Sequence, residues 1–117
     1  MIKLTNTSLK RLEGVDSRLV RVVKHAAEIS DLMFNVSEGL RTKERQEQLF
    51  KEKKTKTLNS KHLVGRAVDL YPIENGKIAW NKFEELSKIM FKSAEDCNVK
   101  ITWGGNWKFV DKPHYEI

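Results

Sequence analysis

The sequence predicts an α+β fold, because helix-like and strand-like patterns occur together in one short chain. Apolar residues recur at helical spacing in two stretches, after Asp16 and after Asn81, whereas residues 67–71 alternate in the manner of a strand. The chain has 117 residues, a length that fits one domain with a core large enough to fold alone. We therefore expect residues 1–117 to form a single domain.

Residues 1–12 give little indication of structure, and the first clear helix begins at Asp16 or Ser17. Either side chain can cap a helix N-terminus. His25 lies within this helix with no motif around it, and we expect it on the helix surface. Several apolar residues follow the start of the helix at near-helical spacing: Leu19, Val22, Val23, Ala26 and Met33.

A short strand and a second helix are predicted next. Phe34 and Val36 alternate with polar residues, as in a strand. Thr42 can open a polar helix over residues 43–50. A loop rich in lysine and threonine is then expected over residues 51–59.

The second half of the chain predicts a hairpin, a helix and a strand. Asn-Gly at residues 75–76 is a strong hairpin signal. Asn81, with Glu84 three residues later, predicts a capping box. Val99 and Ile101 predict a final short strand. The helix after Asn81 has an apolar face of core residues: Phe83, Leu86, Met90 and Ala94.

Composition excludes several classes of protein. Hydrophobic residues make up 39% of the chain, and no apolar run approaches the length of a membrane span. The N-terminus lacks the basic-then-apolar pattern of a signal peptide, so we expect synthesis in a cytoplasm. Cys97 is the only cysteine, which rules out an internal disulfide, and we expect it to be a buried, inert thiol.

The formal net charge of +6 does not identify a partner by itself. Basic residues are spread along the chain, and residues 51–54 form the only compact basic cluster. No helix-turn-helix pattern or aromatic-rich platform for single strands accompanies them. We expect no nucleic-acid partner and no stable membrane association, with a weak attraction to an anionic cell wall as a minor effect.

The most informative residues are a histidine and a carboxylate seven positions apart, His62 and Asp69. Asp69 has apolar neighbours on both sides, so it needs a partner that neutralises it. A divalent metal shared with His62 would do so, and imidazole plus carboxylate suits zinc. The pair alone is also compatible with structural roles. His114 near the chain end offers a third ligand, and Asp111 stands three residues before it.

The two half-motifs together resemble a known enzyme family. Ser-x-His-x-x-Gly-x-Ala-x-Asp over residues 60–69 and Asp-x-x-His over residues 111–114 resemble the zinc D-Ala-D-Ala carboxypeptidases and L-alanyl-D-glutamate endopeptidases, especially small phage endolysins. The resemblance implies that zinc is bound by three residues: His62, Asp69 and His114. It also implies a small antiparallel sheet that carries the zinc site, flanked by helices, as in the hedgehog signalling domain.

Other residues of the family pattern surround this site. Gly-x-Arg-Thr-x-x-x-Gln over residues 39–46 matches the family and implies that Arg41 lies beside the zinc, where its guanidinium can stabilise an oxyanion. Gln46 is a weaker candidate for substrate contact, because a glutamine on a polar helix face usually meets water. In the family, a Trp-Gly-Gly segment borders the cleft, which implies substrate contact by Trp103 and Gly104. Ser60 can bind a ligand or only cap its turn.

The resemblance implies a catalytic metallopeptidase. Three protein ligands leave a fourth zinc position open, and Asp111 corresponds to the catalytic base, with Glu116 as the alternative. We expect a hydrolase that degrades the cell wall: a monomeric, bacteriolytic endolysin that cuts the peptidoglycan stem peptide, at the L-alanyl-D-glutamate bond. It would be made in the host cytoplasm and act at the periplasm or cell wall after release by a membrane-perforating partner.

Three other functions remain open on the sequence. A D,D-carboxypeptidase or dipeptidase of the same fold would usually need extra elements around a terminal carboxylate. A non-catalytic zinc-binding interaction module would not need Asp111 and Arg41 together. A basic nucleic-acid binder is the most distant alternative.

Overall fold

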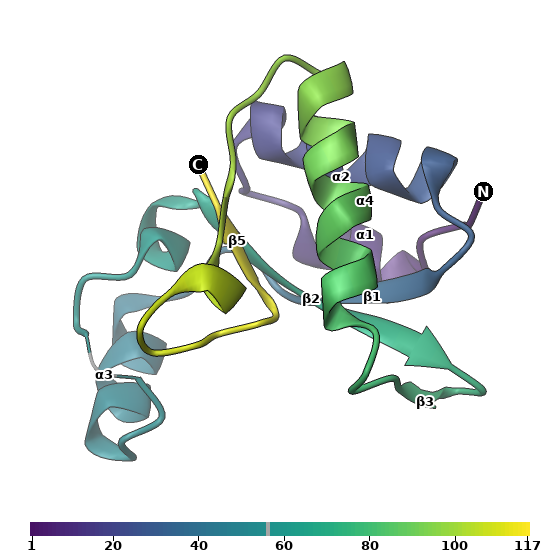
Figure 1. Cartoon of the computed structure of the whole chain (residues 1–117). Coiled ribbons are helices and arrows are strands. Elements are labelled where there is room, and N and C mark those ends of the chain that lie inside the picture. The colour runs from purple at the N-terminus through teal and green to yellow at the C-terminus, as the bar shows by residue number, and fades with distance from the viewer. Residues whose placement is uncertain (56) are drawn as a thin grey trace.

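The computed structural model describes residues 1–55 and 57–117 and contains helices and short strands (Figure 1). The helices are α1 Asn6–Arg11, α2 Ser17–Ile29, α3 Lys43–Lys51, η1 Lys61–Val64, α4 Phe83–Asp96 and η2 Gly104–Asn106, where η1 and η2 are 3-10 helices. The strands are β1 Met33–Glu38, β2 Ala67–Glu74, β3 Lys77–Ile78, β4 Thr102–Trp103 and β5 His114–Glu116.

The strands form an antiparallel sheet in the order β1-β2-β5-β4, with β3 paired to β2. The central strand β2 has β1 on one side and β5 on the other. In this register Asp69 lies opposite Glu38 of β1 and opposite His114 of β5. Residues far apart in sequence are therefore brought into one row across the sheet, and the predicted α+β class is confirmed.

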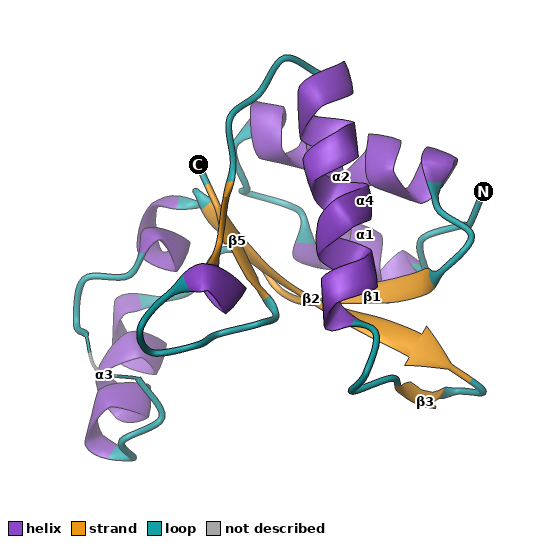
Figure 2. Ribbon diagram, in the orientation of Figure 1, coloured by secondary structure: helices purple, strands orange, loops and turns teal. Residues whose placement is uncertain are grey.

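One face of the sheet packs against helices and makes the core (Figure 2). Helices α2 and α4 contact each other, and α4 also contacts β2. In β2, Val68 and Leu70 are fully buried in this core, whereas Asp69 and Tyr71 are half-buried on the opposite face. The alternation predicted for this strand is confirmed, and it leaves Asp69 on the face that the helices do not cover.

Three local predictions are confirmed by backbone contacts. Asp16 caps α2 by accepting a hydrogen bond from Arg18 N at 2.9 Å. The Arg18 side chain also donates to this carboxylate, and these bonds lower the pKa of Asp16 to about 2. Thr42 caps α3. Asn75 and Gly76 have φ values of 53° and 75°, the left-handed pair that a tight turn between β2 and β3 requires.

Helix α1 was not predicted from the sequence, and the reason lies in the contacts that hold this helix. It is one short helix whose only buried residue is Ser8. Ser8 Oγ accepts from Val36 N at 2.9 Å, and Arg11 donates to Val36 O at 3.0 Å. Hydrogen bonds to β1 therefore hold α1, and they produce no apolar periodicity in the sequence.

Some predicted elements are misplaced. The capping box is wrong: Lys82 occupies the N-cap of α4, with no side-chain hydrogen bond to the helix end. The strand predicted at Val99 and Ile101 is wrong in position, because Val99 N still bonds Ala94 O at the end of α4 and pairing starts only at β4. Met33 belongs to β1, not to the first helix.

Cys97 and the loop after α3 also differ from expectation. Cys97 is half-buried at the C-terminus of α4, so the prediction of a buried thiol is wrong. Helix α3 extends through Lys51, which moves the start of the loop predicted for residues 51–59. Lys56 in this loop lies outside the described residues. Among the described residues, no helix combines the length and apolar character needed to cross a membrane.

Candidate metal and catalytic site

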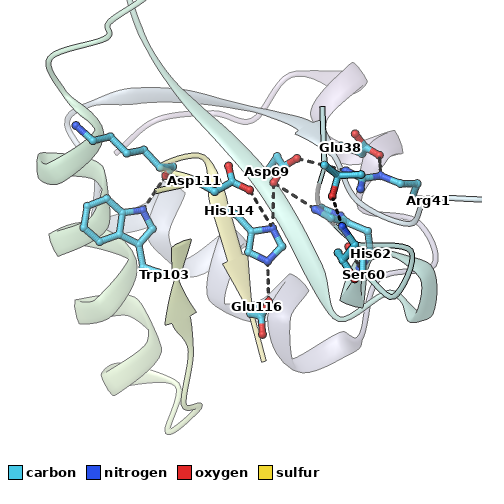
Figure 3. Close-up of polar contacts among 12 residues, drawn as sticks. Glu38, Arg41, Ser60, His62, Asp69, Trp103, Asp111, His114 and Glu116 are labelled. Atoms are coloured by element: carbon cyan, nitrogen blue, oxygen red, sulfur yellow. Dashed lines mark hydrogen bonds and ion pairs between the residues drawn. The ribbon is translucent and has the colours of Figure 1, made fainter. Parts of the chain in front are cut away.

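The structure brings three predicted ligands together on the open face of the sheet (Figure 3). His62 comes from η1, Asp69 from β2 and His114 from β5. One possible ligand atom from each residue lies within 4.8 Å of the other two. Asp69 Oδ1 is 3.2 Å from His62 Nε2 and 3.4 Å from His114 Nδ1.

The orientation of His62 is fixed from behind. Its ring is 2% exposed, and Nδ1 lies 2.8 Å from Gly39 O. A carbonyl only accepts hydrogen bonds, so Nδ1 carries a proton and the Nε2 lone pair of the neutral ring faces Asp69. Ser60 Oγ accepts from His62 N at 3.2 Å, so Ser60 caps this turn. Gly65 ends the turn at φ 70°.

His114 faces Asp69 with Nδ1, whereas His62 faces it with Nε2. Its Nε2 lies 2.8 Å from Glu116 Oε1, and Nδ1 faces Asp69. Glu116 therefore bonds the ring edge opposite to Asp69, which does not favour the alternative in which Glu116 is the catalytic base. The Trp107 ring packs against His114 with centroids 4.9 Å apart. Sequence reasoning missed this contact of Trp107.

When both rings are neutral, three acceptors face one another: His62 Nε2, His114 Nδ1 and an oxygen of Asp69. Acceptors this close together need a cation between them. Burial favours protonation of Asp69, but hydrogen bonds from His114 and His62 outweigh it and lower its pKa. Burial by itself would lower the pKa of His114, because it disfavours the charged ring. The hydrogen bonds of His114 with Asp69 and Glu116 outweigh burial and raise this pKa. Protons can supply the missing positive charge, and so can a metal. Two imidazole nitrogens and a carboxylate oxygen suit zinc.

Asp111 lies beside the three candidate ligands without joining them. Its Oδ2 is 4.0 Å from His114 Nδ1, and its side chain is 51% exposed. Burial and the charge of Asp69 raise its pKa. The neighbouring Lys112 pairs with another carboxylate, with its Nζ 3.6 Å from Glu84 Oε1. The carboxylate of Asp111 is thus placed within reach of a small molecule at the ligands.

Trp103 and Gly104 support the Asp111 loop from behind. Trp103 is 8% exposed and its indole N–H donates to Lys112 O at 2.7 Å. Asp111 N donates to Gly104 O at 2.9 Å, and a Cβ on Gly104 would lie 2.4 Å from Asp111 O. Close approach of two backbones therefore explains the glycine. Substrate contact by these two residues stays a prediction.

Arg41 reaches the site from the end of β1. Its Nε donates to Glu38, Nη1 donates to Gln46 Oε1 at 2.7 Å, and Nη2 lies 3.8 Å from Asp69 Oδ2. Gln46 is 1% exposed and also donates to Thr57 O at 2.6 Å. Gln46 thus lies behind Arg41, not on a wet helix face. Glu38 was not identified from the sequence, although its position three residues before Arg41 permits the ion pair.

These side chains border a cleft of about 530 Å³. Its lining contains the three ligands, the two predicted catalytic residues and several others, including Ser60, Lys61, Tyr71, Trp107 and Glu116. Three ligands in an open cleft, with a carboxylate beside them, are typical of a metal-dependent hydrolase.

Comparison with known proteins identifies the family. A family model of phage L-alanyl-D-glutamate peptidases matches residues 1–117. The L-alanyl-D-glutamate peptidase of Escherichia phage T5 is 31% identical over 124 residues, which cover 98% of this chain and 88% of the relative. The peptidase of that name from Listeria phage A118 is 32% identical over 83 residues, covering 70% of this chain and 29% of the relative. The chain belongs to the phage L-alanyl-D-glutamate peptidase family, and the resemblance identified from its motifs is confirmed.

A solved structure of similar sequence agrees with this assignment. The Serratia marcescens L-Ala D-Glu endopeptidase ChiX has a TM-score of 0.90 at 34% identity, covering 98% of this chain and 90% of ChiX. The vancomycin-resistance D,D-pentapeptidase VanY, solved in complex with Zn(II), has a TM-score of 0.55 at 18% identity, covering 87% of this chain and 71% of VanY. The likeness to VanY concerns the fold.

Proposed function

We propose that this chain is a zinc-dependent endopeptidase, an endolysin that hydrolyses the peptidoglycan stem peptide at the L-alanyl-D-glutamate bond. The convergence of His62, Asp69 and His114 with Asp111 beside them carries this proposal. Membership of the peptidase family supports the substrate, because relatives from phage T5 and Serratia are named for this activity. The Zn(II) complex of VanY supports the choice of metal.

His62 Nε2, an oxygen of Asp69 and His114 Nδ1 would hold the zinc. When bound in such a site, zinc supplies Lewis acidity toward the scissile carbonyl and the attacking water. A structural zinc site would normally use four ligands and often several cysteines. The chain has one cysteine, and Cys97 lies at the C-cap of α4, outside the cleft lining.

Asp111 acts as the general base in this proposal. It accepts a proton from the attacking water and returns it to the leaving amine. Half of its side chain is exposed in the cleft, so water and substrate can reach it. General base catalysis contributes a factor of roughly 10²–10⁴ to the rate.

Arg41 stabilises the oxyanion that forms at the scissile carbonyl. Its planar guanidinium offers paired N–H donors. Glu38 and Gln46 hold two of its nitrogens, and this fixes Nη2 on the side of Asp69. A donor held in advance at the place where charge develops needs no reorganisation during the reaction.

We further propose that residues 1–117 work as one monomeric domain, without stable membrane association. Support for one domain comes from the ligands themselves, since η1, β2 and β5 must be assembled together to form the site. The protein would be made in the host cytoplasm and would reach the cell wall after release. The stem peptide proposed as the substrate is part of that wall.

Digestion of purified murein with zinc present tests the function. Mass analysis of the released fragments should show peptides with a new N-terminal D-glutamate, and Asp111→Asn should release far fewer. Release of terminal D-alanine instead would favour a D,D-carboxypeptidase. Murein binding without new amino groups would favour an interaction module.

A further inference from the structure

The two site histidines are held by different kinds of acceptor. His62 has its outer nitrogen, Nδ1, against the backbone carbonyl of Gly39 at 2.8 Å. His114 has its outer nitrogen, Nε2, against the carboxylate of Glu116 at 2.8 Å. One ring therefore meets a neutral acceptor and the other an anionic acceptor. The difference gives Glu116 a chemical role that a carbonyl does not supply.

A lysine holds Glu116 in place. Lys61 Nζ lies 3.2 Å from Glu116 Oε2 and donates to Ile117 O at 2.8 Å. Glu116 keeps 17% of its side chain exposed, whereas Lys61 keeps 44%. Lys61 directly precedes His62, so this contact joins the segment that carries one histidine to the strand that carries the other. Each oxygen of Glu116 thus has its own partner.

We propose that Glu116 is a positioning residue for the metal site, held by Lys61, and that it fixes the tautomer of His114. Both carboxylates at this ring only accept hydrogen bonds, but Glu116 lies 2.8 Å from Nε2 whereas Asp69 lies 3.4 Å from Nδ1, so the proton of the neutral ring stays on Nε2 and the lone pair of Nδ1 faces Asp69. Figure 3 shows Glu116 and Asp69 at opposite edges of the His114 ring. An anionic acceptor also makes the imidazole a stronger ligand. The proposal rests on the proposed zinc site.

The first test measures metal affinity by chelator competition with zinc. Glu116→Ala should weaken zinc binding by about 10–100-fold, the usual effect of losing such a partner. Glu116→Gln keeps an acceptor without its charge, so its zinc affinity should fall by less. The zinc affinity of Lys61→Met should lie between that of Glu116→Gln and that of the parent. Glu74→Ala is the matched control, because Glu74 is a strand glutamate that lies 3.9 Å from a lysine, Lys82, outside the cleft lining.

The second test reads the tautomer directly. In the zinc-free protein at alkaline pH, ¹⁵N NMR should place the proton of His114 on Nε2 in the parent and in Glu116→Gln. In Glu116→Ala the Nδ1-protonated form should appear. A purely structural role of Glu116 would change thermal unfolding and leave the tautomer as it was.

The outcomes separate this proposal from the proposed function. Unchanged tautomer and unchanged zinc affinity in Glu116→Ala would overturn the role of Glu116. If Glu116→Ala does not fold, a parent-like zinc affinity in both Glu116→Gln and Lys61→Met would overturn it. If the parent binds no zinc, the proposed function fails, while the tautomer of the zinc-free protein still decides whether Glu116 orients His114.

Discussion

The two sides of the cleft are built differently. On one side, which we call the inner wall, Arg41 and His62 have only 8% and 2% of their side chains exposed. On the other side, the outer wall, the side chain of Asp111 is 51% exposed and Trp107 is 37% exposed. The inner wall is held by backbone and buried polar contacts, so it can fix ligand geometry. The outer wall carries Asp111, the proposed general base, where water and substrate can reach it.

The largest expected effect comes from removing a ligand. His62→Ala or His114→Ala should abolish zinc binding and murein hydrolysis together, because two remaining ligands do not complete the site. Elemental analysis and a murein digestion assay measure the two losses. His25→Ala is the matched control, since His25 pairs with Asp96 on α2 and α4. Full zinc occupancy in both ligand variants would break the assignment of this site.

A substitution in the outer wall should affect catalysis without affecting metal binding. Asp111→Asn should keep zinc and reduce the rate by roughly 10²–10⁴, because an amide cannot accept the proton of the attacking water. Zinc content and kcat, measured on the same preparation, give the comparison. Asp31→Asn, at an exposed carboxylate paired with the N-terminus, serves as control. A parallel loss of zinc would make Asp111 a ligand, and unchanged hydrolysis would remove it from the mechanism.

Substitution of Arg41 tests whether the inner wall also takes part in catalysis. Arg41→Lys should keep zinc but lower kcat by roughly 10²–10³, the effect of losing one oxyanion donor. A lysine cannot reproduce the planar fork that now meets both Glu38 and Gln46. Kinetics with soluble murein fragments separate kcat from KM. Near-parental kcat would mean that Arg41 serves only the packing of this wall.

The backbone behind His62 should tolerate little change. A Cβ on Gly39 would lie 2.2 Å from Arg11 O, so Gly39→Ala must displace the carbonyl that holds His62. We expect zinc affinity to fall by about 10–100-fold. Gly76→Ala is the control, because it strains a turn at φ 75° away from the site and should leave zinc affinity unchanged. Equal zinc affinity in the parent and in Gly39→Ala would argue against a rigid inner wall.

The sequence predicted the residues of the site better than their supports. The motifs predicted His62, Asp69 and His114 as candidate ligands, and the structure brings them together, because side-chain chemistry and alternation along β2 are local properties. The contacts that orient them are not local: Gly39 O reaches His62 across 23 positions and Lys61 reaches Ile117 across 56. Such partners depend on the register of β1, β2 and β5, which no local pattern specifies.

The errors in the predicted fold have the same physical cause. Helices α2 and α4 were predicted because an apolar face against a core leaves a periodic signal. Helix α1 has no such periodic signal, because Ser8 and Arg11 hold it through hydrogen bonds to β1. Gln46 looked like a surface residue for the same reason: its burial comes from Arg41 and from the loop after α3, not from its own helix.

The smallest expected effect is on stability, at the cap of α2. The backbone N–H of Asp16 donates to Gly65 O at 2.7 Å, so this cap also supports the turn that carries His62. Asp16→Asn keeps that bond and a capping oxygen but loses the ion pair with Arg18. It should therefore lower the melting temperature slightly and leave zinc affinity unchanged.

The pH dependence of that loss identifies its cause. The pKa of Asp16 is lowered to about 2 in the folded protein, against about 3.9 in an unfolded chain. Its charge therefore stabilises the fold fully above pH of about 4, and this contribution disappears as the pH falls toward 2. The melting temperatures of the parent and of Asp16→Asn should differ at neutral pH and converge at about pH 2. A difference that stays constant with pH would show that the capping geometry of Asp16, not its charge, stabilises the fold.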